Sequence, residues 1–133
     1  MKITATTSAE FREQFLSLLK LPSAATVRNI VYFYRVESGI PRVLDQSNIL
    51  YIGQSKRTLF ERYAAKRDFD IEVAYFNRFY RHVIRQYGAL TIDIQPKSDP
   101  RYAEWEALAA YYNKHLEYPP LNRAIPNEPE KKS

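Results

Sequence analysis

Two short runs rich in β-branched and aromatic residues limit most strongly what this chain can fold into. Residues 29–36 and 48–53 both have the composition of β-strands. Because only loop material lies between them, they predict an antiparallel hairpin. Residues 37–41 have the glycine and proline of a turn, and residues 42–47 lengthen the connection. Gly53 is expected to end the second strand, because glycine lets the backbone turn freely.

Helix-start signals lie on both sides of the hairpin. Residues 7–10 and 58–61 both follow the pattern Thr-x-x-Glu, which is typical of a capping box. They predict helices over 8–20, ending at Pro22 and Ser23, and from residue 58 to about 67. A longer apolar pattern predicts a helix over 70–87 that stops at Gly88.

The C-terminal third predicts one more strand and one more helix. Residues 90–95 alternate apolar and polar side chains, as a strand does. Asp99 before Pro100 is a helix start, and the helix should run to about residue 116. We expect its packing face to contain Trp105, Leu108, Ala109, Tyr112 and Leu116.

The order of elements, α-β-β-α-α-β-α, predicts a small α/β or α+β fold with a three-stranded antiparallel sheet flanked by helices. A chain of 133 residues is most simply one domain. We expect this domain over 1–126, with 1–28 as an N-terminal helical extension and 29–122 as the core. The polar residues 127–133 are expected to be a flexible tail.

Composition limits the classes of function. Twenty Lys and Arg against fifteen Asp and Glu give a net charge of +5, which is compatible with a nucleic-acid partner. The absence of cysteine excludes disulfides, cysteine zinc sites and a thiol nucleophile. No apolar run has the length of a membrane span and the N-terminus lacks a signal-peptide core, so a cytoplasmic location without a membrane partner is expected.

Residues suited to phosphodiester hydrolysis are expected to meet at one end of the hairpin. Tyr32 and Tyr51 on adjacent strands can share a face of the sheet. Arg62, one turn into the next helix, can reach back over the end of the second strand. Glu104 and Glu106 lie on the last helix. An acid can hold a divalent metal, an arginine can neutralise phosphate and a tyrosine can hold water.

These residues resemble the GIY-YIG nuclease family. Ile30-Val31-Tyr32 stands at the G-I-Y position, and Tyr51-Ile52-Gly53 matches Y-I-G. The segment YIGQSKRTLFERY is similar to the family's strand–turn–helix, which places Arg62 at its arginine. Pro120-Leu121-Asn122 is similar to the closing P-x-N segment. The resemblance covers roughly residues 29–122, and it includes a glutamate on the last helix.

The resemblance implies a metal-dependent endonuclease that uses Mg²⁺ or Mn²⁺. It implies that Tyr32 is the general base or holds the water, that Tyr51 supports it, and that Arg62 contacts the scissile phosphate. A glutamate would bind the metal and Asn122 would brace the site. Spacing to Asn122 favours Glu106 as the metal ligand, with Glu104 as the alternative.

Two positions depart from the family pattern. Ile30 replaces a glycine, which matters little in a plain strand, and Gln54 stands where several members have a lysine. The missing charge leaves open an alternative, a catalytically degenerate module that binds nucleic acid or a protein. A purely structural role for the two tyrosines, as ordinary aromatic residues of a strand, is the other alternative.

A set of residues around the proposed site could contact a phosphate backbone, although solvated helix faces are the simpler interpretation. The set is Gly53, Gln54, Lys56, Arg57, Lys66, Arg67, Arg78 and Arg81. We expect DNA rather than RNA as the partner, and sequence specificity would need a homodimer, a partner protein or the long hairpin loop. His82 and His115 have no partner at ligand spacing, so structural roles are expected for both.

Overall fold

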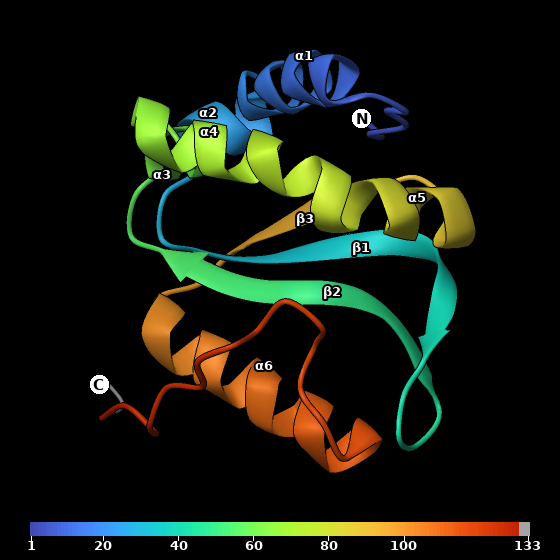
Figure 1. The fold of residues 1–133 in the computed structure, drawn as a ribbon. Coiled ribbons are helices and arrows are strands. Elements are labelled where there is room, and N and C mark those ends of the chain that lie inside the picture. The colour runs from blue at the N-terminus through green and yellow to red at the C-terminus, as the bar shows by residue number, and fades with distance from the viewer. Residues whose placement is uncertain (131–133) are drawn as a thin grey trace.

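The computed structural model describes residues 1–130 and shows a three-stranded antiparallel sheet with helices on both faces (Figure 1). The strands are β1 (Ile30–Pro41), β2 (Gln46–Ser55) and β3 (Thr91–Pro96), in the order β2-β1-β3. The predicted fold class is confirmed. No helix within residues 1–130 is long and apolar enough to cross a membrane.

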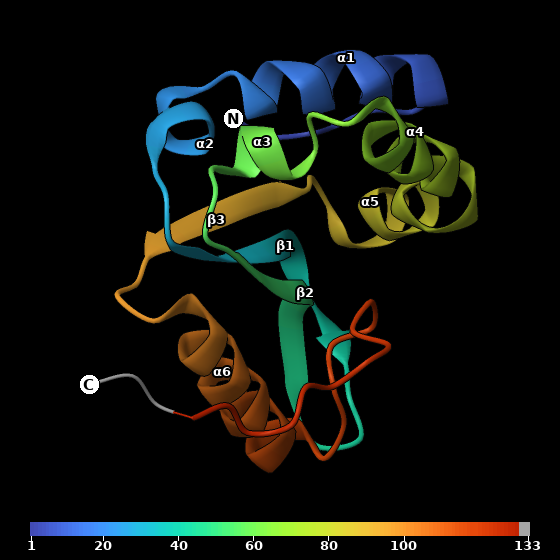
Figure 2. The same ribbon diagram turned by 90° about the vertical axis from the view of Figure 1, so that its left-hand side faces the viewer.

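Six α-helices and one π-helical segment surround this sheet in the described part of the chain. They are α1 (Ser8–Leu19), α2 (Pro22–Thr26), α3 (Leu59–Arg62), α4 (Lys66–Tyr75), the π-helix η1 (Phe76–Tyr80), α5 (Arg81–Tyr87) and α6 (Pro100–His115). α4, η1 and α5 follow one another as a nearly continuous rod between α1 and the sheet, while α6 covers the opposite side (Figures 1 and 2).

The sheet therefore has two differently covered faces. Tyr32, Tyr34 and Tyr51 pack in one core cluster with residues of α1, α4 and η1, and we call this side the upper face. Val31, Phe33 and Ile52 pack with Leu108 and Tyr111 of α6, and we call this side the lower face. Successive residues of a strand alternate between the two sides.

The hairpin is longer than the sequence predicts. Residues 37–41 were expected to turn, but they continue β1, and the turn comes later, where the Arg42 amide donates to the Asp45 carbonyl at 3.0 Å. Asp45 adopts a positive φ of 64°, a conformation open to aspartate. Register shifts after Tyr34 and after Arg35 absorb the irregular pairing. β2 also continues to Ser55, so Gly53 does not end it.

Both predicted capping boxes form. Thr7 accepts from the Glu10 amide at 3.2 Å, and Thr58 accepts from the Glu61 amide at 3.1 Å. The predicted boundaries after residue 20 are less accurate. Pro22 begins the short helix α2, since proline suits a first helical position. α3 stops at Arg62, and the next helix begins at Lys66 rather than at residue 70.

Helix α6 has the predicted start, because the Asp99 side chain accepts from the Tyr102 amide at 3.3 Å. Its packing face was predicted only in part: Leu108 is buried as expected. The buried positions are Pro100, Leu108, Tyr111 and His115, together with the partly buried Ala103 and Ala107. Tyr112 and Leu116, which were expected to be packed, are exposed. The helix is thus rotated about its axis relative to the prediction.

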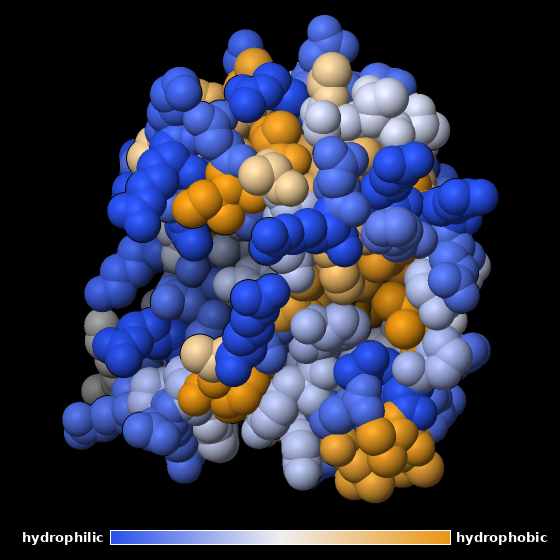
Figure 3. Space-filling view, viewed as in Figure 1, coloured by the Kyte–Doolittle hydropathy of each residue, from blue (hydrophilic) through white to orange (hydrophobic). Residues whose placement is uncertain are grey.

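The hairpin tip and the end of α6 expose an apolar patch. Val43, Leu44 and Leu116 have 68%, 51% and 51% of their surface exposed. Figure 3 shows apolar surface gathered at this tip, at the lower right. Residues 119–130 run beside β2 and α6 with no helix or strand (Figure 2). Part of the expected flexible tail, 131–133, lies outside the described residues.

Candidate active site

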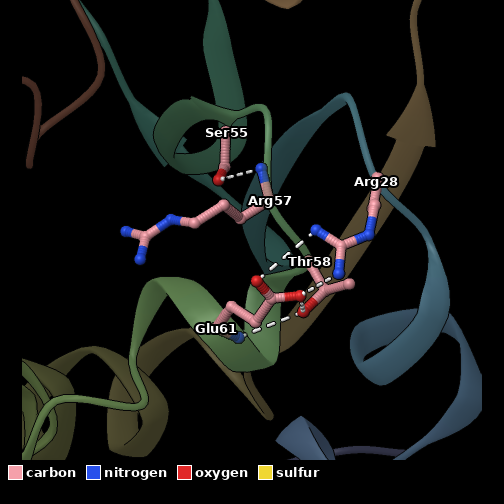
Figure 4. A network of polar contacts seen from close by, with 5 residues as sticks. All are labelled: Arg28, Ser55, Arg57, Thr58 and Glu61. Atoms are coloured by element: carbon pink, nitrogen blue, oxygen red, sulfur yellow. Dashed lines mark hydrogen bonds and ion pairs between the residues drawn. The ribbon is translucent and has the colours of Figure 1, made fainter.

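A network of polar contacts fixes the junction between β2 and α3 (Figure 4). The Arg57 amide donates to the Ser55 hydroxyl at 3.0 Å, and Thr58 caps α3. Arg28 forms an ion pair of 2.7 Å with Glu61. The Arg57 side chain points away from this network (Figure 4). Because α3 is a single turn, the network decides where the half-buried Arg62 lies.

Tyr32 lies directly over Gly53, its partner across the sheet. A Cβ atom at position 53 would lie 2.5 Å from Cζ of Tyr32, closer than any real contact. Gly53 is buried and sits inside the strand, so it serves the packing of Tyr32 rather than a turn or a nucleic-acid contact. Tyr32 itself is only 1% exposed.

Four tyrosines cluster around Arg62 on the upper face. The rings of Tyr32 and Tyr51 have centroids 6.0 Å apart, and the hydroxyls of Tyr34 and Tyr63 share a buried hydrogen bond of 2.6 Å. The Arg62 guanidinium lies 5.0 Å from the centroid of the Tyr63 ring. The structure therefore brings together the two tyrosines and the arginine predicted from the sequence. It adds Tyr34 and Tyr63, which the sequence analysis missed.

Burial controls the ionisation of these phenols. Burial raises the pKa of Tyr32 far above the ordinary value; Tyr51 raises it as well, while Arg62 lowers it. Burial also raises the pKa of Tyr51, the nearby charge of Glu104 raises it further, and Arg62 acts in the opposite direction. Both phenols consequently stay protonated at neutral pH. Tyr51 is the one that reaches solvent, since it is only partly buried.

Asn122 clamps the strand that carries Tyr51. Its side chain accepts from the Ile52 amide at 3.0 Å and donates to the Ile52 carbonyl at 2.9 Å. The Leu121 amide adds a bond of 2.9 Å to the Leu50 carbonyl. Asn122 thus holds the backbone of β2 between Tyr51 and Gly53.

The two candidate glutamates differ in their surroundings. Glu104 is half-buried and its charge acts on Tyr51, whereas Glu106 is exposed and has no described interaction with the site. Two residues along a helix point about 200° apart, so only one of the pair can face the tyrosines. The rotated packing face of α6 selects Glu104. Of the two candidates named from the sequence, Glu104 is therefore the one whose charge acts on Tyr51.

Glu104 could offer one carboxylate to a hard divalent cation. Burial raises the pKa of its carboxyl, Arg101 lowers it, and no group within residues 1–130 donates a hydrogen bond to it. The described residues contain no group of three or more His, Cys, Asp or Glu side chains that could hold a metal. Mg²⁺ keeps several waters and is commonly bound through one or two carboxylates, so a single Glu104 fits such an ion.

A partly buried carboxylate that was not predicted from the sequence, Glu72 of α4, lies in the same region. It accepts a hydrogen bond of 2.6 Å from the Tyr80 hydroxyl. Burial raises the pKa of Glu72, while the Tyr80 hydrogen bond and the charge of Arg62 lower it. Its position four residues before Phe76, on the apolar side of the helix, was the available signal.

The predicted basic contacts are spread over a long surface. Lys56 and Arg57 lie on the loop between β2 and α3, beside the site. Lys66 is paired with Asp70 at 3.0 Å, while no ion pair within residues 1–130 involves Arg67, Arg78 or Arg81. At 1.5 Å per residue, Arg81 lies about 22 Å along the helical rod from Lys66. Of these cations, Lys56 and Arg57 are the two on the loop that connects β2 to α3.

The remaining predicted residues have structural surroundings. The Gln54 Oε1 atom is buried and has no hydrogen-bond partner within the described chain. His115 is 3% exposed, with Nδ1 3.0 Å from the Leu44 carbonyl, and His82 is exposed on α5.

The chain was compared with protein-family models, with curated proteins and with solved structures, and none of them matches it.

Proposed function

We propose that this protein is a metal-dependent endonuclease that hydrolyses nucleic-acid phosphodiester bonds, with DNA as the favoured substrate. The clustering of Tyr32, Tyr51 and Arg62 on the upper face, with the charge of Glu104 acting on Tyr51, is the observation that supports this most directly. The order of these residues in the sequence resembles that of GIY-YIG nucleases, which supports the proposal independently of the geometry. Nucleic acid in the cytoplasm would be the target.

In this proposal Arg62 neutralises the phosphate, because its guanidinium is partly buried and is held by α3. Tyr51 holds the attacking water through its hydroxyl. Tyr32 supports Tyr51 from below the surface, since it is too buried to touch a substrate. Neither phenol removes the proton from water, because burial keeps both protonated, so this proton would pass to bulk solvent.

Glu104 would hold the divalent ion. When bound, such an ion supplies a Lewis acid that lowers the pKa of water and counters charge on the phosphate. The loop cations Lys56 and Arg57 would contact neighbouring phosphates, as their exposed side chains have no ion pair within residues 1–130.

A plasmid-nicking assay tests this proposal. Supercoiled plasmid should be nicked with Mg²⁺ or Mn²⁺ and not with EDTA. Glu104→Gln should lose this activity, and Glu106→Gln, its matched control two residues away, should keep it. The opposite pattern would return the metal ligand to Glu106.

The absence of nicking by the wild-type protein would contradict the proposal. Retention on DNA at low salt without nicking, with a steep loss of binding as salt rises, would instead favour the degenerate binding module. The unpartnered Gln54 at the position of the family lysine is the observation that keeps this second candidate.

A further inference from the structure

A pocket of about 220 Å³ opens beside Arg62 on the upper face. Its walls come from β2, the helical rod and the segment after α6, and they include Tyr51, Ile71, Glu72, Tyr75, Leu121 and Arg123. Glu104 is not among the lining residues, because α6 covers the lower face. The pocket therefore extends from Arg62 and Tyr51 away from the proposed metal ligand.

The lining has apolar faces and a few directed polar groups. Tyr75 is stacked against Phe79, with centroids 5.7 Å apart, and the Arg123 guanidinium lies 5.7 Å from the Tyr75 ring centroid. Arg123 also donates to the Tyr75 hydroxyl at 2.9 Å, which fixes this corner. Aromatic walls with a few placed polar groups are typical of sites that take a flat, polar-edged ligand.

Glu72 provides the polar group on the inner wall of this pocket. One of its carboxylate oxygens accepts from Tyr80 at 2.6 Å, and no group within residues 1–130 donates to the other. The partly buried Glu72 carboxylate lies next to aromatic rings. A ligand that supplies a hydrogen-bond donor could bond to its second oxygen. An exocyclic amino group of a nucleobase is such a donor, and carboxylates accept from cytosine N4 in known recognition chemistry.

We propose that this pocket receives one unpaired nucleobase, from the nucleotide next to the phosphate at Arg62, and that Glu72 accepts from its amino group. This inference rests on the proposed function, because Arg62 lines both sites. Bases inside a regular duplex are stacked and cannot enter such a pocket without being extruded. The substrate class is therefore nucleic acid with an unpaired base at the cut, such as a bulge, a flap or a single strand.

Binding in EDTA tests the pocket separately from cleavage. The probes are fluorescent DNA duplexes with a one-nucleotide bulge that carries cytosine, thymine or an abasic residue, and affinity is measured by anisotropy. Stacking of one base on aromatic side chains predicts that the cytosine bulge binds roughly 5- to 150-fold more tightly than the abasic one. The thymine bulge should lie between them, since it offers no amino group.

Two variants assign the effect to the pocket. Ile71 is 53% exposed at the pocket wall, so Ile71→Trp should fill the pocket and bring the cytosine-to-abasic affinity ratio close to one. Leu16→Trp is the matched control, since Leu16 is 38% exposed on α1 and does not line the pocket, and it should keep the ratio. Glu72→Gln should remove the preference for cytosine over thymine and retain the preference for a base over the abasic residue.

Equal binding of the cytosine and abasic probes by the wild-type protein would overturn the inference, as would an Ile71→Trp variant that keeps the wild-type ratio. An unchanged affinity for the abasic probe shows that each variant is folded. Metal-dependent nicking without a base preference would overturn the pocket alone. A base preference without nicking would support the pocket and contradict the proposed endonuclease, and no binding of any probe would overturn both.

Discussion

The two faces of the sheet are built from the same three strands, yet they bury different chemistry. The lower face packs Val31, Phe33 and Ile52 against α6 in an almost wholly apolar contact. The upper face buries tyrosine hydroxyls, Glu72 and part of Arg62 under the helical rod. Burying ionisable groups is unfavourable unless they are paired, so the upper face gives up stability that an apolar core would supply.

The contrast extends to the helices that cover the two faces. These helices differ in how closely they follow the local sequence rules for helix termini. Helix α6 follows them, with Asp99 as its cap and Lys114 and His115 in its last turn. Helix α4 breaks them, because it starts without a side-chain cap and has Lys66 and Arg67 in its first turn, where cations are unfavourable.

The largest expected effect is on the nicking rate, which one substitution on the upper face should lower and one on the lower face should not. Arg62→Ala should reduce metal-dependent nicking by roughly 10²- to 10³-fold, the usual loss when one group that stabilises transition-state charge is removed. On the lower face, Phe33→Leu should lower the free energy of unfolding by about 1 kcal/mol and leave the nicking rate of folded protein unchanged. Equal losses of activity in both variants would break the comparison.

The second effect concerns the close contact of Tyr32 with Gly53. Gly53→Ala should lower the free energy of unfolding by about 1–3 kcal/mol, because the buried ring has to move. At Gly39 an added Cβ meets only the exposed, flexible Gln46 side chain, so Gly39→Ala should change stability by less than about 0.5 kcal/mol. Urea unfolding of both variants measures the difference, and similar values would contradict it.

A third pair compares one hydroxyl from each face. Tyr63→Phe removes the partner of the buried Tyr34 hydroxyl and should destabilise the protein by about 1–3 kcal/mol. The Tyr111 hydroxyl of the lower face is buried without a partner within residues 1–130, so Tyr111→Phe should be neutral or stabilising. Thermal unfolding checks both, and a larger loss in Tyr111→Phe would reverse the contrast.

The smallest effect is a dependence of stability on pH. Because burial raises the pKa of Glu72, the folded state binds more protons than the unfolded state once the pH exceeds about 4.3, the ordinary value for glutamate. The free energy of unfolding should therefore fall as pH rises through this range. Glu72→Gln should remove part of this fall. Urea unfolding at several pH values measures this dependence. If wild type and Glu72→Gln lose the same free energy of unfolding per pH unit, the interpretation is wrong.

The sequence was sufficient where local signals and the final structure agree. Strand composition located the paired core of the hairpin around Tyr32 and Tyr51, and two Thr-x-x-Glu boxes located helix starts. The alternating pattern over residues 90–95 located β3 to within one residue at each end. These features depend on neighbours in the chain, which a sequence displays directly.

Features set by long-range packing could not be predicted in this way. The rotation of α6 depends on which side chains fit under β1 and β2, so the choice between Glu104 and Glu106 was not determined by spacing. The π-helix η1 changes the angular position of Tyr80 relative to Glu72, and no local sequence pattern predicted this π-helix. Arg123 joins the pocket only because the chain returns past β2 after α6.

That returning segment has a consequence for solubility. β2 is an outer strand of the sheet, and unpaired outer strands can join other chains edge to edge and so start aggregation. The bonds from Leu121 and Asn122 occupy backbone groups of Leu50 and Ile52 along this edge. The same few residues that brace the proposed site therefore also shield the sheet from self-association.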